Sequence, residues 1–387
     1  MSLIVDEHRQ YLADEPRIAA YREAIAEVVR PGDVVLDLGS GTGILGLLSC
    51  RAGAKRVYSI EKSGMVELAR SIARANGFGD RVVFIKGFST RVELPEEVDV
   101  VVCDQIGRFG FEAGVLEFFE DARKRFLKPN GKLIPSCIEM TVAPVEDATL
   151  WNQIEFWNGS PAGFDFRPAR AWAANTGYPA HYAPDELLGE PVVLARTDLT
   201  RATTAPFRGE AHLAVTRAGT LHGIGGWFAA QLSLSVTMTN SPLASQSIAR
   251  SNAFLPIDQP VGVAPGDCVH VKMHVMPSDL MLTWNVEVRE HHPGAPGPSS
   301  NGLKGRFSHS TMHGMLLCSE DLKKTRPEFV PQLSLWGEAR RSILELCDGH
   351  RPLAEIEQEI LRRHANLFPS LKEAAAFVAE VVTAYSQ

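Results

Sequence analysis

A glycine-rich segment with an acidic residue in front of it is the clearest chemical signal in the sequence. Residues 35–43 (VLDLGSGTG) read as a short strand that ends in a turn and leads into a helix. Glycines in such a turn let the backbone approach a ligand closely. We therefore take the carboxylate before the turn and the glycines within it as candidate cofactor-binding residues: Asp37, Gly39, Gly41 and Gly43.

Two classes of cofactor fit a turn of this kind. Residues 41–46 also match the G-x-G-x-x-G pattern of dinucleotide-binding enzymes, so a dehydrogenase has to be considered. Asp37 argues against a pyrophosphate, because the carboxylate would place negative charge next to it. S-adenosylmethionine carries an ammonium and a sulfonium instead. The next predicted strand ends at Glu61, where a carboxylate can accept hydrogen bonds from both ribose hydroxyls. The sequence thus predicts S-adenosylmethionine as cofactor, with helix capping by Asp37 and Glu61 as the competing explanation.

A Rossmann-like sheet would position these residues. An amphipathic pattern over 17–29 precedes short apolar segments that alternate with helical patterns, at 34–36, 56–60, 82–85, 98–103 and 132–134. This alternation predicts a parallel, doubly wound sheet over residues 1–135.

The pattern changes after Pro135. Many short alternating segments predict an antiparallel β-barrel or sandwich over 136–310, with an aromatic- and proline-rich arm at about 151–190. Residues 331–387 return to helical spacing and predict a small helical C-terminal domain. The predicted fold class is therefore α/β, followed by a β-rich domain and a helical domain.

Composition narrows the classes of partner. The chain has 387 residues, of which 45% are hydrophobic, enough for two or three domains. A net charge of -7 gives no electrostatic footprint for nucleic acid, and no apolar run approaches a membrane span, so we expect neither partner. The six cysteines form no C-x-x-C pair, which predicts reduced thiols, no metal site and a cytoplasmic protein.

Over roughly its first 300 residues the sequence resembles the protein arginine methyltransferases. The resemblance rests on residues 37–45 (DLGSGTGIL), 52–57 (AGAKRV), 76–77 (NG), 92–95 (VELP) and 127–131 (LKPNG). It implies a methyltransferase that uses S-adenosylmethionine and whose β-rich domain helps to hold the methyl acceptor. It also implies residue roles that local pattern alone does not give.

Three of these implied roles concern the cofactor. Residues 8–21 resemble the helix that the family folds over its cofactor, which implies that Arg17 pairs with the methionine carboxylate. The resemblance also implies that Ser89 and Thr90, in the loop after Gly87, lie beside the adenine. The family usually has a carboxylate where Thr90 stands, so adenine contacts here would come from backbone groups or the hydroxyl.

The acceptor loop matches the family less closely. Two glutamates hold the substrate guanidinium in the family, and Asp104 and Glu112 correspond to them in residues 103–112 (CDQIGRFGFE). We take both as candidate catalytic residues, with helix capping as the alternative. Arg108 adds a positive charge that could neutralise them. The family's His-Trp pair is missing from the matching residues 247–252 (SIARSN).

These features predict an enzyme that methylates a nitrogen on a peptide, a protein or a related acceptor, with arginine as one option. A small-molecule methyltransferase and a non-catalytic cofactor-binding scaffold remain the alternatives. Residues 163–165 (GFD) resemble the family's dimerisation arm, which makes a homodimer an expected partner. Residues 343–356 resemble small winged-helix domains that bind leader peptides, so the C-terminal domain either docks a peptide or is a structural cap.

Overall fold

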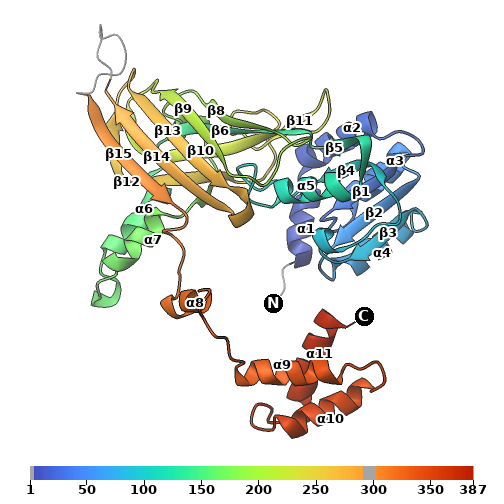
Figure 1. Cartoon of the computed structure of the whole chain (residues 1–387). Helices are drawn as coiled ribbons and strands as arrows, with labels where there is room; N and C mark the ends of the chain where they lie inside the picture. The colour runs from blue at the N-terminus through green and yellow to red at the C-terminus, as the bar shows by residue number, and fades with distance from the viewer. Residues whose placement is uncertain (1–3, 291–301, 387) are drawn as a thin grey trace. The chain divides into compact units, whose positions relative to one another are not determined.

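A computed structural model describes residues 4–290 and 302–386 of the chain (Figure 1). It consists of two compact units, Met1–Met315 and Leu316–Gln387, and each is described by itself. The smaller unit begins at Leu316, ahead of the boundary at 331 that helical spacing suggested. No helix in the described part of the chain is long and apolar enough to cross a membrane.

The first part of the larger unit is a five-stranded parallel sheet in the order β3-β2-β1-β4-β5. The strands are β1 (Val34–Leu38), β2 (Arg56–Glu61), β3 (Val82–Lys86), β4 (Val98–Cys103) and β5 (Leu127–Ile134). The accompanying helices are α1 (Ile4–Ala13), α2 (Glu15–Val28), α3 (Ile44–Ala52), α4 (Met65–Ala75) and α5 (Val115–Arg125), with a 3-10 turn η1 (Ser89–Arg91). Strands β2 and β3 follow on one side of β1, whereas β4 and β5 lie on its other side, so the strand order reverses between β1 and β4. Open α/β sheets bind ligands at such a switch point.

The strands at the switch point are almost fully buried. Every residue of β1 is buried, and so is all of β4 except Asp99. Continuous apolar runs of this kind suit a parallel sheet that is covered on both faces. The charged ends of these two strands, Asp37 in β1 and Asp104 after β4, therefore stand out as exceptions that need partners.

Two antiparallel sheets form the rest of the larger unit. One has the order β7-β12-β10-β6-β8 with β11 added to β10, and the other has the order β15-β14-β13-β9. The indole Nε1 of Trp284, fully buried in β14, donates to the carbonyl of Pro256 in β12 at 2.8 Å and joins the two sheets. The strands are β6 (Cys137–Val145), β7 (Tyr178–Ala180), β8 (Val192–Asp198), β9 (Phe207–Ala214), β10 (Gly219–Gln231), β11 (Thr237–Thr239), β12 (Asn252–Val263), β13 (Cys268–Met276), β14 (Met281–Arg289) and β15 (Leu303–Ser310).

The arm between β6 and β7 is more helical than its sequence suggested. It contains α6 (Ala148–Glu155), α7 (Arg170–Ala174) and the 3-10 turns η2 (Phe156–Asn158), η3 (Pro161–Gly163) and η4 (Arg167–Ala169). Two further turns, η5 (Pro184–Glu186) and η6 (Pro277–Asp279), lie among the strands. The part of the predicted arm that follows α7 joins the first sheet as β7, because residues 178–180 pair with β12.

The smaller unit contains α8 (Ser319–Lys324), α9 (Leu335–Leu346), α10 (Leu353–Arg363) and α11 (Leu371–Tyr385). Its own core is formed by apolar faces of the last three helices, including Ile343, Ile360 and Val378, all fully buried. Ser334 and Ser370 cap α9 and α11. None of its residues up to 386 forms a strand, so helices alone carry the resemblance to winged-helix domains, which stays a prediction.

Candidate active site

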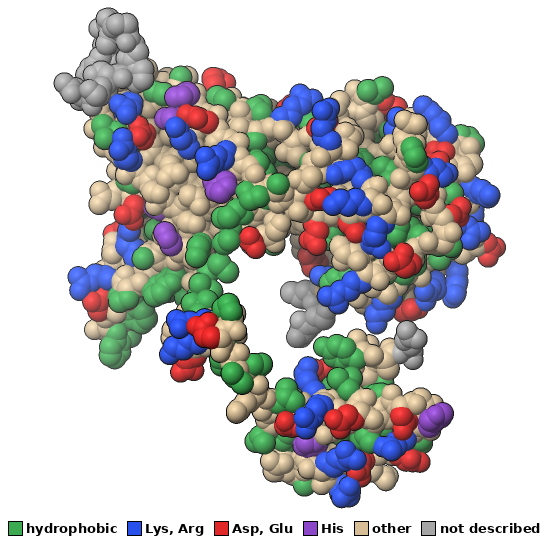
Figure 2. Space-filling view, in the orientation of Figure 1, with side chains coloured by type: hydrophobic (Ala, Val, Ile, Leu, Met, Phe, Trp, Pro, Cys, Tyr) green, Lys and Arg blue, Asp and Glu red, His purple; other side chains and the backbone are tan. Residues whose placement is uncertain are grey.

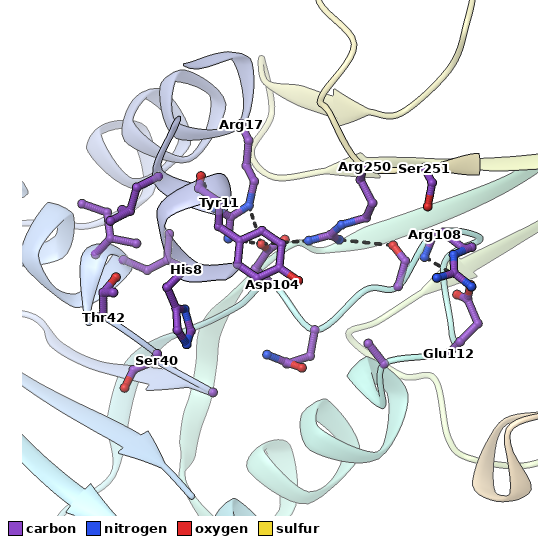
Figure 3. A pocket seen from close by; sticks show the side chains of 18 residues that line it. His8, Tyr11, Arg17, Ser40, Thr42, Asp104, Arg108, Glu112, Arg250 and Ser251 are labelled. Carbon is purple, nitrogen blue, oxygen red and sulfur yellow. Dashed lines mark hydrogen bonds and ion pairs between the residues drawn. The ribbon is translucent and has the colours of Figure 1, made fainter. Parts of the chain in front are cut away.

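A cavity of about 510 Å³ opens at the carboxyl ends of β1 and β4 (Figure 3). The glycine turn forms one wall, α1 and the start of α2 form another, and the loop 103–112 with the segment before β12 closes the rest. Of the residues that the sequence singled out, five line it: Arg17, Gly39, Gly41, Asp104 and Glu112. Of the others, Gly43 belongs to the glycine turn, Asp37 and Glu61 accept hydrogen bonds from Gly46 and Gly41, and Ser89 and Thr90 follow β3.

The glycines of the turn are required by its geometry. Gly39, Gly41 and Gly43 have φ angles of 66°, 51° and 80°, a region that side chains disfavour. A Cβ on Gly41 would lie 2.5 Å from the imidazole of His8, and one on Gly39 would lie 2.8 Å from the side chain of Gln105. The turn therefore brings bare backbone to the surface of the cavity, as a bound cofactor requires.

Two carboxylates accept hydrogen bonds from backbone N–H groups of this turn and of the start of α3. Oδ2 of Asp37 accepts a hydrogen bond from the N–H of Gly46 at 2.9 Å. Oε2 of Glu61 accepts one from the N–H of Gly41 at 3.0 Å, while its Oε1 accepts one from Ser63 at 2.8 Å. Both residues thus shape the cofactor turn, although neither is among the residues that line the cavity.

Asp37 is an unusual carboxyl group. Burial is the main cause that raises its pKa to about 7; the hydrogen bond from Gly46 opposes the rise, and the charge of Glu61 adds to it. Its Oδ1 has no hydrogen-bond partner among the described residues. A buried carboxylate oxygen without a donor favours a nearby cation. The ammonium of S-adenosylmethionine would supply one, so this side of the turn fits that cofactor.

Arg17 and Asp104 connect helix α2 to the end of β4. The guanidinium of Arg17 donates through both Nε, at 2.6 Å, and Nη2 to Oδ2 of Asp104, and its Nη1 donates to the carbonyl of Tyr11 at 3.0 Å. The hydroxyl of Tyr21 donates to Oδ1 of Asp104 at 3.0 Å. Arg17 therefore lies in the cavity wall, where it can also bind a carboxylate of the cofactor.

A second guanidinium reaches the same carboxylate. Arg250, just before β12, donates through Nη2 to Oδ2 of Asp104 and through Nη1 to the carbonyl of Gly107, both at 3.2 Å (Figure 3). Burial alone would raise the pKa of Asp104, but the charges of Arg250 and Arg17 outweigh burial and lower it. The cation that neutralises Asp104 is therefore not Arg108, as the loop sequence suggested, but Arg250 together with Arg17.

Glu112 uses its carboxylate to shape the acceptor loop. Its two oxygens accept hydrogen bonds from the backbone N–H groups of Arg108, Phe109 and Phe111, at 3.0 to 3.2 Å. A Cβ on Gly107 would lie 2.3 Å from the same carboxylate, so the loop closes tightly around it. The structure brings Asp104 and Glu112 to one cavity but commits both carboxylates to contacts within the protein.

The β-rich part of the unit fixes this loop through Asn240. Its Nδ2 donates to the carbonyls of Arg108 at 2.8 Å and Ser251 at 2.9 Å, and its Oδ1 accepts from Phe228. Gly226 in β10 lets the ring of Phe109 pack against the strand, because a Cβ there would lie 2.6 Å from the ring. Sequence reasoning missed Asn240 and the role of Arg250, since both act across long sequence separations.

The residues predicted beside adenine are not among those that line the cavity. Ser89 and Thr90 form η1 after β3, and the carbonyl of Ser89 accepts a hydrogen bond from Arg125. Gly87, just before them, donates to the carbonyl of Glu61 at 3.0 Å, which places this turn next to the end of β2. Their role in adenine binding stays a prediction.

One cluster outside the cavity was not apparent from cysteine and histidine spacing. Glu210 and His212 in β9 and His270 in β13 bring their ligand atoms within 4.8 Å of one another. Cross-strand pairing explains it, because His212 lies opposite His270. Nε2 of His270 is 2.6 Å from Glu210, so the cluster already contains an internal contact.

Comparison with known families matches both parts of the larger unit. Residues 22–153 match the family described as ribosomal protein L11 methyltransferase (PrmA). Residues 138–288 match the family described as arginine methyltransferase oligomerization subdomain. The two matches meet near β6, where the parallel sheet gives way to the antiparallel sheets.

Individual relatives are also protein arginine methyltransferases. The chain is 31% identical over 252 residues to protein arginine N-methyltransferase 1 of Chlamydomonas reinhardtii, covering 64% of this chain and 72% of that protein. It is 29% identical over 290 residues to protein arginine N-methyltransferase 6 of Xenopus tropicalis, covering 71% and 85%. Among solved structures, Arabidopsis thaliana protein arginine methyltransferase 10 matches with a TM-score of 0.69 at 22% identity, covering 79% of this chain and 97% of that one.

The fold, the cofactor turn and the relatives agree on the reaction class. The predicted fold class is confirmed, and so is the prediction of S-adenosylmethionine as cofactor. A dehydrogenase is excluded by the same matches. The chain belongs to the protein arginine N-methyltransferase family and is an S-adenosylmethionine-dependent methyltransferase.

Proposed function

We propose that this enzyme methylates a guanidinium nitrogen of arginine in a protein or peptide. The relatives named above are protein arginine N-methyltransferases, which supports this acceptor class. The observation that carries the proposal is the guanidinium of Arg250 on Asp104 and the carbonyl of Gly107. The cavity wall beside the cofactor turn thus contains a set of oxygens that binds a guanidinium.

The cofactor has identifiable partners in this chain. Arg17 would bind its methionine carboxylate, and Glu61 would bind its ribose. The bare backbone of the glycine turn would lie against the cofactor. S-adenosylmethionine would supply an electrophilic methyl group on its sulfonium for transfer to the acceptor nitrogen. The protein's task is to align the nitrogen with this methyl group and to exclude water.

Asp104 suits the holding of a guanidinium better than the removal of its proton. Its lowered pKa, caused by Arg250 and Arg17 against the effect of burial, keeps it ionised. An ionised group with a low pKa is a weak base but a good partner for a cation. The acceptor nitrogen therefore loses its proton to water or to another group, while Asp104 orients the guanidinium.

The acceptor proposal can be tested with paired peptides. We would incubate the full-length enzyme and S-adenosylmethionine with an arginine-containing peptide and with the same peptide carrying lysine instead. Fragment mass spectra should place the methyl group on the guanidinium of the first peptide and leave the second unmodified. Methylation of the lysine peptide, or of a small molecule only, would contradict the proposal.

We also propose that the enzyme acts as a homodimer formed through the arm. Phe164 and Trp172 are 69% and 41% exposed, and Figure 2 shows hydrophobic side chains gathered over α6 and α7. Exposed aromatic side chains of this density mark protein contact surfaces. Light scattering should give twice the mass of the chain, and Phe164→Glu should reduce it to one chain; a wild-type monomer would contradict the proposal.

A further inference from the structure

We propose that Arg250 occupies the position of the acceptor guanidinium and that an arginine substrate has to displace it from Asp104. This inference rests on the proposed function, and it makes Arg250 an internal competitor of the acceptor. It comes from the contacts of Asp104, Gly107 and Arg250 in the cavity wall (Figure 3).

Oδ2 of Asp104 has no capacity left for another donor. It accepts from Nε and Nη2 of Arg17 and from Nη2 of Arg250, whereas Oδ1 accepts from Tyr21. A carboxylate oxygen offers about two lone-pair sites, so three donors crowd Oδ2 and one site stays open on Oδ1. A substrate guanidinium can therefore pair with both oxygens of Asp104 only if a donor leaves Oδ2.

Arg250 is the donor that can leave at the lowest cost. Arg17 makes two hydrogen bonds to Asp104 and a third to Tyr11, and Tyr21 is fully buried. Arg250 makes one hydrogen bond to Asp104 and one to Gly107, at 3.2 Å each, and rests near the ring of Phe228. Its side chain keeps 16% exposure, which leaves a path to solvent.

The backbone beside Arg250 is anchored on both sides. The N–H of Ala249 donates to Oδ2 of Asp14 at 2.9 Å, and the carbonyl of Ser251 accepts from Asn240 at 2.9 Å. Displacement therefore needs only a change of side-chain rotamer, without movement of the segment.

An internal competitor weakens the binding of every guanidinium acceptor by the same factor. Because Arg250 is tethered, it competes at a high effective concentration, and free arginine has only its guanidinium to oppose it. A peptide can add contacts elsewhere on the enzyme and use them to drive the exchange. Lysine would replace a planar group with a point charge that cannot bridge Asp104 and Gly107 in the same way. We therefore expect the enzyme to prefer arginine within a peptide over free arginine, and this preference comes from the added contacts.

Arg250→Ala provides the first test, by calorimetry with methylguanidinium chloride as the probe. The variant exposes the oxygens of Asp104 and Gly107, so it should bind methylguanidinium about tenfold or more tightly than the wild type. Adding Asp104→Asn to Arg250→Ala should remove this binding. Arg196→Ala is the matched control, because Arg196 pairs with Glu139 outside the cavity. Equal binding by Arg250→Ala and the wild type would overturn the inference.

Turnover gives the second test and separates the two proposals. The kcat/KM for an arginine peptide should rise about tenfold in Arg250→Ala, because the acceptor no longer has to displace Arg250. Methylguanidinium binding to Arg250→Ala without arginine methylation by any variant would contradict the proposed function alone. Arginine methylation with an unchanged kcat/KM would contradict only the displacement. Arg250→Lys, which keeps the charge, should give an intermediate kcat/KM and serves if Arg250→Ala does not fold.

Discussion

Arg17 and Asp104 lie 87 residues apart in the sequence and form an ion pair in which Nε of the arginine is 2.6 Å from Oδ2 of the aspartate. Their side chains are only 8% and 9% exposed. The pair joins the helix that precedes the sheet to the loop that faces the acceptor. A cofactor carboxylate bound by Arg17 and an acceptor bound by Asp104 would therefore share one network.

Replacement of Arg17 should weaken cofactor binding. Arg17→Ala should raise the Kd for S-adenosylmethionine about tenfold to a hundredfold, because a charge-assisted bidentate pair is lost. Arg17→Lys should recover only part of the affinity, since an ammonium cannot form the same planar contact. Calorimetry measures this, with the exposed Arg22 of the same helix changed to alanine as control. An unchanged Kd in Arg17→Ala would remove Arg17 from the cofactor site.

Replacement of Asp104 should lower the stability of the protein. Asp104→Ala leaves two guanidinium groups partly buried without their carboxylate, which should lower the free energy of unfolding by about 3–5 kcal/mol. The double variant Asp104→Ala with Arg250→Ala should regain part of that loss, because one unpaired charge is gone. Urea unfolding measures the free energy of unfolding of the single and the double variant. A double variant that loses the full sum of the two single effects would show that Arg250 and Asp104 do not interact.

Replacement of Glu112 should separate turnover from cofactor binding. Glu112→Gln loses one of the two oxygens that accept backbone N–H groups of the loop, at a cost of about 1–3 kcal/mol to the loop's conformation. We expect kcat for an arginine peptide to fall while the Kd for S-adenosylmethionine stays unchanged. Glu117→Gln, an exposed substitution on α5, is the control. A parallel loss of kcat and cofactor affinity would mean that the loop also supports the cofactor.

Removal of the smaller unit tests its role. Deleting residues 316–387 should leave a folded protein with unchanged affinity for S-adenosylmethionine, because the larger unit has its own core and contains the whole cavity. If the smaller unit docks a peptide, KM for a peptide acceptor should rise while kcat stays the same. Insoluble truncated protein would favour the structural cap, and identical kinetics on every acceptor would exclude the docking role.

The parts of the site that follow from local pattern could be read from the sequence. Asp37 lies near the end of one apolar strand, and Gly39 and Gly41 follow that strand directly, so their proximity depends on few residues. Glu61 ends the neighbouring strand, and the parallel register places Leu38 opposite Ile60. The local sequence therefore determines the cofactor side of the cavity.

The acceptor side depends on contacts that local pattern does not encode. Arg250 meets Asp104 across 146 residues, and Asn240 meets Arg108 across 132. Both contacts exist only because the antiparallel sheets pack against the loop after β4. The sequence could indicate that residues 247–252 lack the family's His-Trp pair, but it could not indicate that Arg250 binds the acceptor carboxylate instead.

The buried carboxyl of Asp37 should make stability depend on pH in the sense opposite to most aspartates. Burial raises its pKa in the folded protein from 3.8 to about 7. Between these values the folded state holds a proton that the unfolded state has released, so the free energy of unfolding falls as pH rises from about 4 to 7 and stays low above it. Asp37→Asn keeps an acceptor oxygen for Gly46 and removes the charge.

Asp37→Asn should therefore be more stable than the wild type at pH 8, by on the order of 2–4 kcal/mol, and only slightly different at pH 4, since each pKa unit corresponds to about 1.4 kcal/mol. The same variant should bind S-adenosylmethionine more weakly, because the ammonium loses its negative partner. In the wild type, cofactor affinity should rise between pH 6 and about 8, with proton release on binding as Asp37 ionises. Urea unfolding at both pH values and calorimetry in buffers of different ionisation enthalpy measure these effects. A pH-independent affinity, together with equal stability of the two proteins at pH 8, would show that Asp37 serves only to brace the glycine turn.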